Sequence, residues 1–262
     1  MAGADEDQQR VVLNHVLDAL KRLDLSSTPP EMGDKIHRLV REVTSSDDPY
    51  REVKEHSTQE ALTLYSRLKA LVSESPDPLD RAVRLSIAGN VIDLGPVGEY
   101  DLWATIERAM AQPFAIDDSA AFRDALAGAK WVLYLADNAG ETVFDRVLIE
   151  TIGRPVVYAA KGGPILNDAT VNDALAAGLD EVAEVISTGS DAPGTILDRC
   201  TEDFRRRYNQ AELIIAKGQA NYETLSTERK GIFFLLQTKC PVIARDVGVP
   251  AGSIVLKRGE MN

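Results

Sequence analysis

The sequence has few of the residues that disulfide, thiolate and imidazole chemistry require. Its 262 residues include two cysteines, Cys200 and Cys240, and three histidines, His15, His37 and His56, all in the N-terminal third. Two such cysteines provide neither a disulfide framework nor a zinc motif. We therefore expect no histidine-based zinc site and no histidine-based catalytic triad in the rest of the chain.

Basic residues and long apolar runs are also scarce. The chain has 29 Lys and Arg against 41 Asp and Glu, which gives a formal net charge of −12. This balance argues against nucleic acid and anionic membranes as partners. No apolar run approaches the ~20 residues of a transmembrane helix, and the opening MAGADEDQQR does not resemble a signal peptide. We expect a soluble, cytoplasmic protein in which an anionic ligand meets locally placed cations or a metal ion.

The spacing of apolar residues changes near residue 130. Residues 9–127 show helical spacing, as in QEALTLYSRLKALV, with prolines between the helical segments and no strand-like alternation. Later, short apolar runs alternate with helical patterns such as 141–152 and 194–208. The expected strands are 131–136, 155–160, 182–187, 212–216, 232–236 and 254–257. This order predicts an α/β chain: a helical N-terminal region (1–128), then a Rossmann-like, mostly parallel sheet with helices on both faces (129–262).

Three of the expected strands end in polar turns that contain glycine. The run WVLYLA (131–136) leads into Asp137 and Asn138, and the second run leads into KGGPILNDAT (161–170). A later run leads into KGQANYETL (217–225). In a parallel sheet these turns share the edge at which such sheets bind ligands. Their convergence is stronger evidence for a site than any single motif.

The turns offer oxygen ligands and cations. Asp137, Asn138 and Asp168 provide two carboxylates and a carboxamide, which suit magnesium, manganese or another octahedral ion. Lys161 and Lys217 each begin a turn, where an ammonium group can neutralise phosphate oxygens. Glycines allow backbone N–H groups to approach an anion; they are Gly140, Gly162, Gly163 and Gly218. The chemistry indicated is metal-assisted hydrolysis of a phosphate ester.

Other interpretations stay open at this point. Asn138 could cap the helix that follows it, Asn167 or Asp168 could cap the helix around 171–177, and both lysines could be solvated. The chain lacks G-x-G-x-x-G after the first strand and lacks G-x-x-x-x-G-K-[ST], which counts against dinucleotide and P-loop chemistry. Ala139 stands where a haloacid-dehalogenase phosphatase would carry its second aspartate. A Rossmann-like methyltransferase and a non-catalytic, metal-dependent binder of sugar phosphates or nucleotides remain alternative functions.

Seven motifs carry a family resemblance. The helical region contains DPYREVK (48–54) and AGNVID (88–93). They are followed, in order, by LADNAGETVFD, KGGPILNDAT, STGSDAPGTIL, KGQANYETL and LLQTKCPVIA. In these motifs the chain resembles the metal-dependent damage-control phosphatases, the domain-of-unknown-function family number 89. The resemblance implies a helical region joined to a Rossmann-like part. It also implies hydrolysis of phosphate monoesters of small metabolites, often sugars or damaged metabolites, with manganese, magnesium, cobalt or nickel as cofactor.

The same resemblance implies roles for individual residues. Asp137, Asn138 and Asp168 match the metal ligands, Glu141 matches an acid that contacts the sugar-like part of the substrate, and Lys239 matches a lysine that contacts its phosphate. Together with the residues singled out in the turns, the matching positions give the predicted substrate site: Asn90, Asp93, Glu141, Lys161, Lys217, Gly218, Asn221 and Lys239. Direct attack by water and an aspartyl-phosphate formed on Asp137 are both open routes.

The chain departs from the family pattern near its start. Prokaryotic-type members often begin with a Cys-x-x-Cys segment, which this chain lacks, so Cys240 would be without those partners. The R-T-x-K motif of the eukaryotic branch corresponds here to Leu236, Gln237, Thr238 and Lys239. The sequence therefore places the chain nearer the prokaryotic-type branch.

Overall fold

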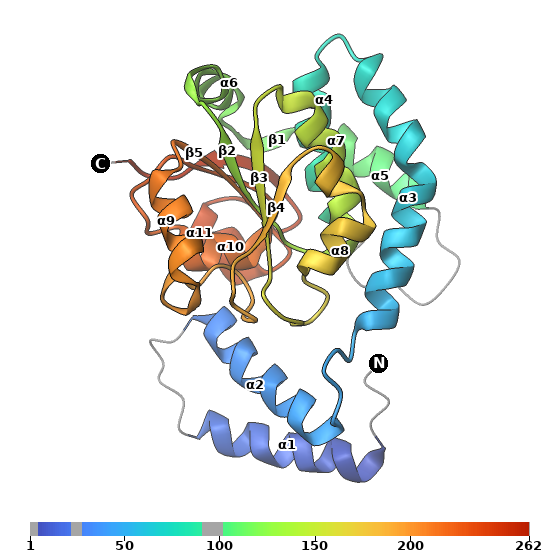
Figure 1. Cartoon of the computed structure of the whole chain (residues 1–262), viewed down its shortest axis with the longest axis vertical. Helices are drawn as coiled ribbons and strands as arrows, with labels where there is room; N and C mark the ends of the chain where they lie inside the picture. The colour runs from blue at the N-terminus through green and yellow to red at the C-terminus, as the bar shows by residue number, and fades with distance from the viewer. Residues whose placement is uncertain (1–4, 22–27, 91–101, 262) are drawn as a thin grey trace.

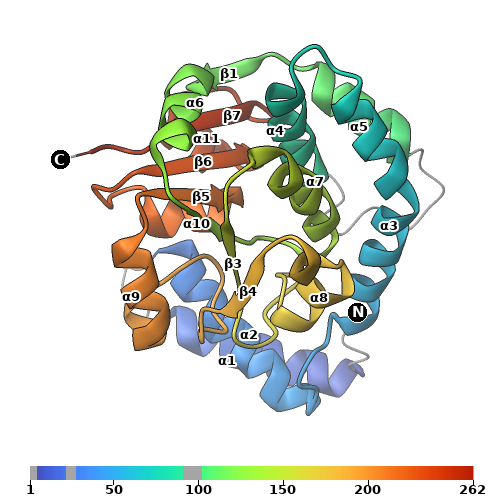
Figure 2. The same cartoon turned by 45° about the horizontal axis from the view of Figure 1, so that its top comes forward.

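A central sheet of seven strands lies between two layers of helices in the computed structural model, which describes residues 5–21, 28–90 and 102–261 (Figure 1, Figure 2). The strand order is β1-β7-β6-β5-β2-β3-β4. None of the described helices is long and apolar enough to cross a membrane. The α/β architecture that the sequence predicts is confirmed.

Five neighbouring strands are parallel, as the alternation of strands and helices predicts. At the centre, β2 (Val132–Leu135) pairs with β3 (Val156–Ala160) on one side and with β5 (Leu213–Lys217) on the other. The set is completed by β4 (Glu184–Ser187) beside β3 and by β6 (Ile232–Gln237) beside β5. The carboxyl ends of these five strands therefore lie along one edge.

The two remaining strands run the opposite way. β7 (Ile254–Arg258) is antiparallel to β6, and β1 (Phe114–Asp117) is parallel to β7. The expectation that residues 9–127 contain no strand is therefore wrong. β1 has four residues that alternate between half-buried and exposed, so its local signal is weak, and its pairing with a distant strand stabilises it. The expected boundary between 1–128 and 129–262 stays a prediction, although β1 joins the sheet of the second part.

Helices cover both faces of the sheet. Alternate strand residues enter two separate cores, with Tyr134 in the first core and Leu133 in the second. The helices on the first face are α3 (Arg51–Ser73), α4 (Pro78–Gly89), α5 (Leu102–Ala111), α6 (Ser119–Gly128), α7 (Thr142–Ile152) and α8 (Val171–Ala176). Those on the second face are α9 (Glu202–Gln210), α10 (Gly218–Leu225) and α11 (Pro241–Val247). The helix expected over 194–208 thus begins later, at Glu202.

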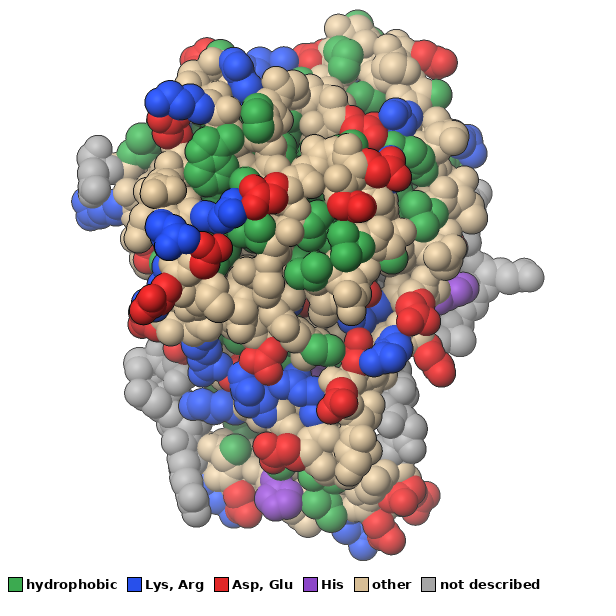
Figure 3. Space-filling view, viewed as in Figure 1, with side chains coloured by type: hydrophobic (Ala, Val, Ile, Leu, Met, Phe, Trp, Pro, Cys, Tyr) green, Lys and Arg blue, Asp and Glu red, His purple; other side chains and the backbone are tan. Residues whose placement is uncertain are grey.

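The first two helices, α1 (Glu6–Leu20) and α2 (Pro29–Thr44), lie beyond the carboxyl edge of the parallel strands (Figure 1). Arg41 of α2 donates to the carbonyl of Pro164 (2.7 Å), which follows β3, and to the carboxylate of Asp191 (2.9 Å), which follows β4. Figure 3 shows basic and acidic side chains side by side at the level of α2. Ion pairs therefore fasten α2 to the turns at this edge.

Gly89 offers a test of the packing between α4 and α7. A Cβ atom at Gly89 would lie 2.8 Å from Cγ of Phe144, a fully buried residue. We expect Gly89→Ala to lower the free energy of unfolding by about 1–3 kcal/mol, the usual cost of overpacking a core. Gly128→Ala is the control, because a Cβ there meets nothing within 4 Å. Urea denaturation measures both variants, and equal stabilities would contradict the tight α4–α7 contact.

Candidate active site

Backbone pairing brings the turns after β2 and β3 together. Asn138 and Asp168 form an isolated antiparallel bridge. Beside it, the backbone N–H of Ala169 donates to the carbonyl of Asp137 (2.7 Å). The two chain segments that carry the predicted metal ligands therefore run next to each other, as expected for neighbouring parallel strands.

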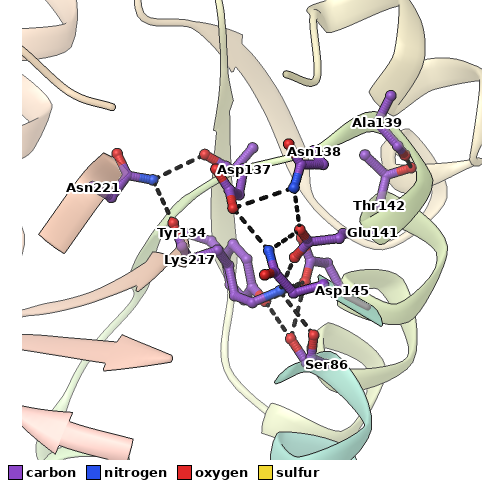
Figure 4. A network of polar contacts seen from close by, with 12 residues as sticks. Ser86, Tyr134, Asp137, Asn138, Ala139, Glu141, Thr142, Asp145, Lys217 and Asn221 are labelled. Carbon is purple, nitrogen blue, oxygen red and sulfur yellow. Dashed lines mark hydrogen bonds and ion pairs between the residues drawn. The ribbon is translucent and has the colours of Figure 1, made fainter. Parts of the chain in front are cut away.

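The amide of Asn138 is oriented through its nitrogen. Its Nδ2 atom donates to Oε1 of Glu141 (2.7 Å) and lies 3.4 Å from Oδ2 of Asp137. Asn90, at the end of α4, also uses Nδ2 to donate to Oδ2 of Asp137 (2.9 Å) and to Oε1 of Glu141. The oxygen Oδ1 of Asn138 is thereby the atom that can serve as a ligand beside Asp137 (Figure 4).

A buried lysine lies among these side chains (Figure 4). Lys217 is 0% exposed, and its Nζ atom donates to Glu141 (2.8 Å), to Asp145 (2.8 Å) and to the carbonyl of Ser86 (3.0 Å). Burial by itself would lower the pKa of Lys217, but the carboxylates of Asp145 and Glu141 outweigh burial and raise it above its ordinary value. Lys217 is therefore a cation at neutral pH, and its charge offsets that of two buried acids.

Asp145 is a central hydrogen-bond acceptor of this network. It accepts hydrogen bonds from the hydroxyls of Ser86 (3.0 Å), Tyr134 (2.7 Å) and Tyr158 (3.0 Å), as well as from Lys217. Burial, and next the carboxylate of Asp145, raise the pKa values of Tyr134 and Tyr158 well above their ordinary value. Both hydroxyls therefore keep their protons and act as donors.

Sequence reasoning missed Asp145. The residue lies four positions after Glu141, so the two acids fall on the same side of the helical segment. Asp145 is fully buried on α7, a helix whose other buried side chains are mostly apolar. An acid at an inward position of that helix is the signal that could have identified it.

The carboxyl group of Asp137 lies in an acidic, buried environment. Burial raises its pKa well above the ordinary value, and the carboxylates of Glu141 and Asp168 raise it further, while Lys239 and Lys217 act in the opposite direction. A carboxyl group in such surroundings is more stable with a bound proton or cation than as an isolated carboxylate. Acids perturbed in this way are often found at functional sites.

Two further predicted residues hold the ends of β2 and β5. Gly218 has φ +77 and approaches Asp137 so closely that a Cβ atom would overlap its carboxylate. The side chain of Asn221, 0% exposed, donates from Nδ2 to the carbonyls of Ala136 (3.0 Å) and Lys217 (2.8 Å). Glycine is therefore required at position 218, and Asn221 holds the ends of β2 and β5 together.

The three predicted lysines differ in accessibility. Lys161 is 3% exposed, and its Nζ atom lies 3.5 Å from Oδ2 of Asp168 and donates to a backbone carbonyl. Lys239 is exposed, and its charge lowers the pKa of Asp137. Lys217 and Lys161 are buried, so Lys239 is the most exposed of the three predicted lysines.

A pocket of about 460 Å³ opens beside Lys161. Its walls come from the start of α3, the turn after β3 and the start of α8. Among the predicted site residues within the described ranges, Lys161 contributes to this wall, so the pocket adjoins the ligand group from the β3 side.

The chemical types of the predicted ligand residues suit a divalent ion. Asp137, Asn138 and Asp168 supply hard oxygen ligands, and the acidic surroundings of Asp137 favour a cation. Among the described residues, however, no three His, Cys, Asp or Glu side chains form a ready metal-binding group. An ion held by two carboxylates and a carboxamide would complete its coordination with water or substrate oxygens. Metal dependence stays a prediction.

Helix capping does not account for these side chains. Within the described part of the chain, Asn138 makes no side-chain capping bond to the short 3-10 helix Ala139–Glu141 that follows it. The cap of α8 is Thr170, not Asn167 or Asp168. The two lysines of the turns are buried, so they are not solvated. The predicted residue Asp93 lies outside the described residues.

Gly218 offers a test of the close approach to Asp137. Gly218→Ala would press a methyl group against the carboxylate in a backbone with φ +77. We expect a roughly tenfold or greater loss of Mn²⁺ affinity in calorimetry, as for other changes that displace a ligand. Gly248→Ala is the matched control, because its φ is +85 but a Cβ there meets nothing within 4 Å. Equal Mn²⁺ affinity in the two variants would show that this approach does not shape the site.

Comparison with known proteins covers nearly the whole chain. Residues 1–255 match the damage-control phosphatase ARMT1-like domain. A damage-control phosphatase of Archaeoglobus fulgidus is 37% identical, over 96% of this chain and 91% of the relative. A damage-control phosphatase of Pyrococcus horikoshii is 37% identical, over 99% and 92%. A crystal structure of the Pyrococcus protein, described as a DUF89 family protein, has a TM-score of 0.91 over 99% of this chain and 92% of that chain. The motifs are thus confirmed as a family signature, and the chain belongs to the damage-control phosphatase family with the ARMT1-like domain.

Proposed function

We propose that this protein is a metal-dependent phosphatase that hydrolyses phosphate monoesters of small metabolites, such as sugar phosphates or damaged metabolites. The observation that carries the proposal is the pairing of Asn138 with Asp168, next to Asp137, at the edge where parallel sheets bind ligands. The relatives named damage-control phosphatases support the reaction class. The oxygen ligands support manganese, magnesium, cobalt or nickel as the ion.

The network around the ligands supports a preorganised site. Glu141 and Asn90 hold the side chains of Asn138 and Asp137, and Lys217 holds Glu141 in turn. Phosphoryl transfer depends mainly on positioning and on fixed charges that meet the developing negative charge. Groups that already stand in place need little reorganisation when this charge develops.

Charge balance assigns a role to Lys239. A divalent ion would, when bound, polarise the phosphoryl group and stabilise the charge that develops on it. The carboxylates of Asp137 and Asp168 match the two charges of such an ion, so a dianionic phosphate needs a further cation. Lys239 is exposed and acts on Asp137, whereas Lys217 is fully buried. We therefore assign the phosphate contact to Lys239.

Phosphate release tests the proposed function. The protein is incubated with sugar phosphates and p-nitrophenyl phosphate, either with one of the four ions or with EDTA. We expect phosphate release that requires an ion and that Asp137→Ala abolishes, because the variant lacks a ligand carboxylate. Release that persists in EDTA would contradict metal dependence. Methyl transfer without phosphate release would favour a methyltransferase, and sugar-phosphate binding without turnover would favour a binding protein.

Lys239→Met tests the phosphate contact. A charge-assisted hydrogen bond contributes about 1.5–3 kcal/mol, so kcat/KM at saturating metal should fall roughly 10- to 150-fold. Mn²⁺ affinity should stay the same or rise slightly, because a nearby positive charge is removed. The control is Lys130→Met, since Lys130 is 84% exposed and precedes β2 at the opposite edge of the sheet. Wild-type kcat/KM in Lys239→Met would place this lysine outside the phosphate site.

A further inference from the structure

The motif DPYREVK (48–54) has no role in the proposed reaction, yet it is tightly built. It forms the turn into α3, in which Oδ1 of Asp48 accepts the backbone N–H of Tyr50 (3.2 Å). The carbonyl of Asp48 accepts the N–H of Arg51 (3.3 Å). The turn places the Asp48 carboxylate 2.8 Å from Nζ of Lys54 in the first turns of the helix. Within this motif, Lys54 is thus already paired with one acid, Asp48.

Lys54 joins this acid to a second one from a distant part of the chain. Its Nζ atom lies 3.0 Å from Oδ2 of Asp173, near the start of α8. The side chains of Lys54, Asp48 and Asp173 are 3%, 6% and 12% exposed. Lysine is almost never buried to this extent unless it is paired. The ion pairs therefore fix the start of α8 against α3.

Asp173 passes this constraint to the backbone next to Asp168. The oxygen that meets Lys54, Oδ2, also accepts the N–H (2.9 Å) and the hydroxyl (2.6 Å) of Thr170. Thr170 in turn pairs with Lys161 in a parallel bridge. Because Thr170 lies two positions after Asp168, its place limits where the Asp168 backbone can lie.

Residues 168–170 are thus held from two directions. From the sheet, the carbonyl of Asp137 accepts the N–H of Ala169 (2.7 Å), and the N–H of Lys161 donates to the carbonyl of Ala169 (2.8 Å). From the helical region, the contacts run through Thr170 and Asp173 to Lys54. A ligand side chain has to be held within about 0.5 Å of its productive place. A segment fixed on both sides meets this requirement better than one fixed on the sheet side.

We propose that Lys54 is a positioning residue of the metal site: through Asp173 and Thr170 it holds the backbone that carries Asp168. The inference rests on the proposed function, in which Asp168 binds the ion. In this role Lys54 acts through Asp173 and Thr170 and is not itself a ligand of the ion. The motif DPYREVK then couples the helical region to the ligand edge of the sheet.

Titration of Mn²⁺ into Lys54→Met tests this role in the absence of substrate. We expect a roughly tenfold or greater rise in the Mn²⁺ Kd, the usual effect of losing an outer contact of a metal site. Lys54→Arg should restore part of the affinity, because it keeps the charge but not the shape of the ammonium group. The control is Lys69→Met, since Lys69 lies on the same helix and pairs with Glu150 at 2.8 Å. Its Kd should equal that of the wild type.

Thr170→Val tests the route of the constraint. It weakens the link between Thr170 and Asp173, because the hydroxyl that donates to Asp173 and caps α8 is lost while the backbone N–H of Thr170 still donates to Asp173. The Lys54–Asp173 pair stays in place. We expect a raised Mn²⁺ Kd here too. In the double variant with Lys54→Met, the combined rise should be smaller than the product of the two separate rises, because both changes interrupt one chain of contacts.

Each outcome of these titrations decides the proposal. A folded Lys54→Met protein with a lower Tm but a wild-type Kd overturns it, because a merely structural ion pair behaves in that way. If Lys54→Met does not fold, a wild-type Kd in Thr170→Val overturns it instead. A wild-type protein that binds none of Mn²⁺, Mg²⁺, Co²⁺ and Ni²⁺ overturns the proposed metal site itself, and the positioning role with it.

Discussion

The ion pairs of Lys217 with Glu141 and Asp145, both at 2.8 Å, are the interaction on which the candidate site depends. Removing one partner of a buried pair leaves an uncompensated charge, at a cost of about 3–5 kcal/mol. The ammonium group of Lys217 therefore stabilises the buried carboxyl group of Glu141. Glu141 also accepts hydrogen bonds from the side-chain amides of Asn90 and Asn138. The buried charge of Lys217 therefore helps to fix the orientation of the Asp137 and Asn138 side chains.

The candidate site combines residues from the helical region with residues from the sheet. Asn90 and Ser86 come from α4 and its end, whereas Asp137 and Lys217 come from the ends of β2 and β5. The packing of α4 against α7 brings these groups within hydrogen-bonding distance. The hydrophobic core on this face of the sheet therefore sets the geometry of the polar network as well as the stability of the fold.

Local patterns in the sequence were sufficient for the parallel strands and for the turns that carry Asp137 and Asp168. Apart from β4, which begins with Glu184 and ends with Ser187, these strands are short apolar runs followed closely by polar residues, and both signals are local. The strand β1 was missed because its stability comes from β7, far along the chain. The burial of Lys217 was missed for a similar reason, since its partners Glu141 and Asp145 lie on another element. The substrate roles of these residues stay predictions.

The reversal of β7 and β1 separates the end of the chain from the ligand edge. β7 runs against β6, and the backbone N–H of Gly259, just after β7, donates to the carbonyl of Ile232 at the start of β6 (2.8 Å). The chain therefore leaves the sheet at the edge opposite to Asp137 and Asp168. A reporter domain or an immobilisation tag joined after β7 would project from that opposite edge, and the approach of small molecules to the turns would stay unobstructed.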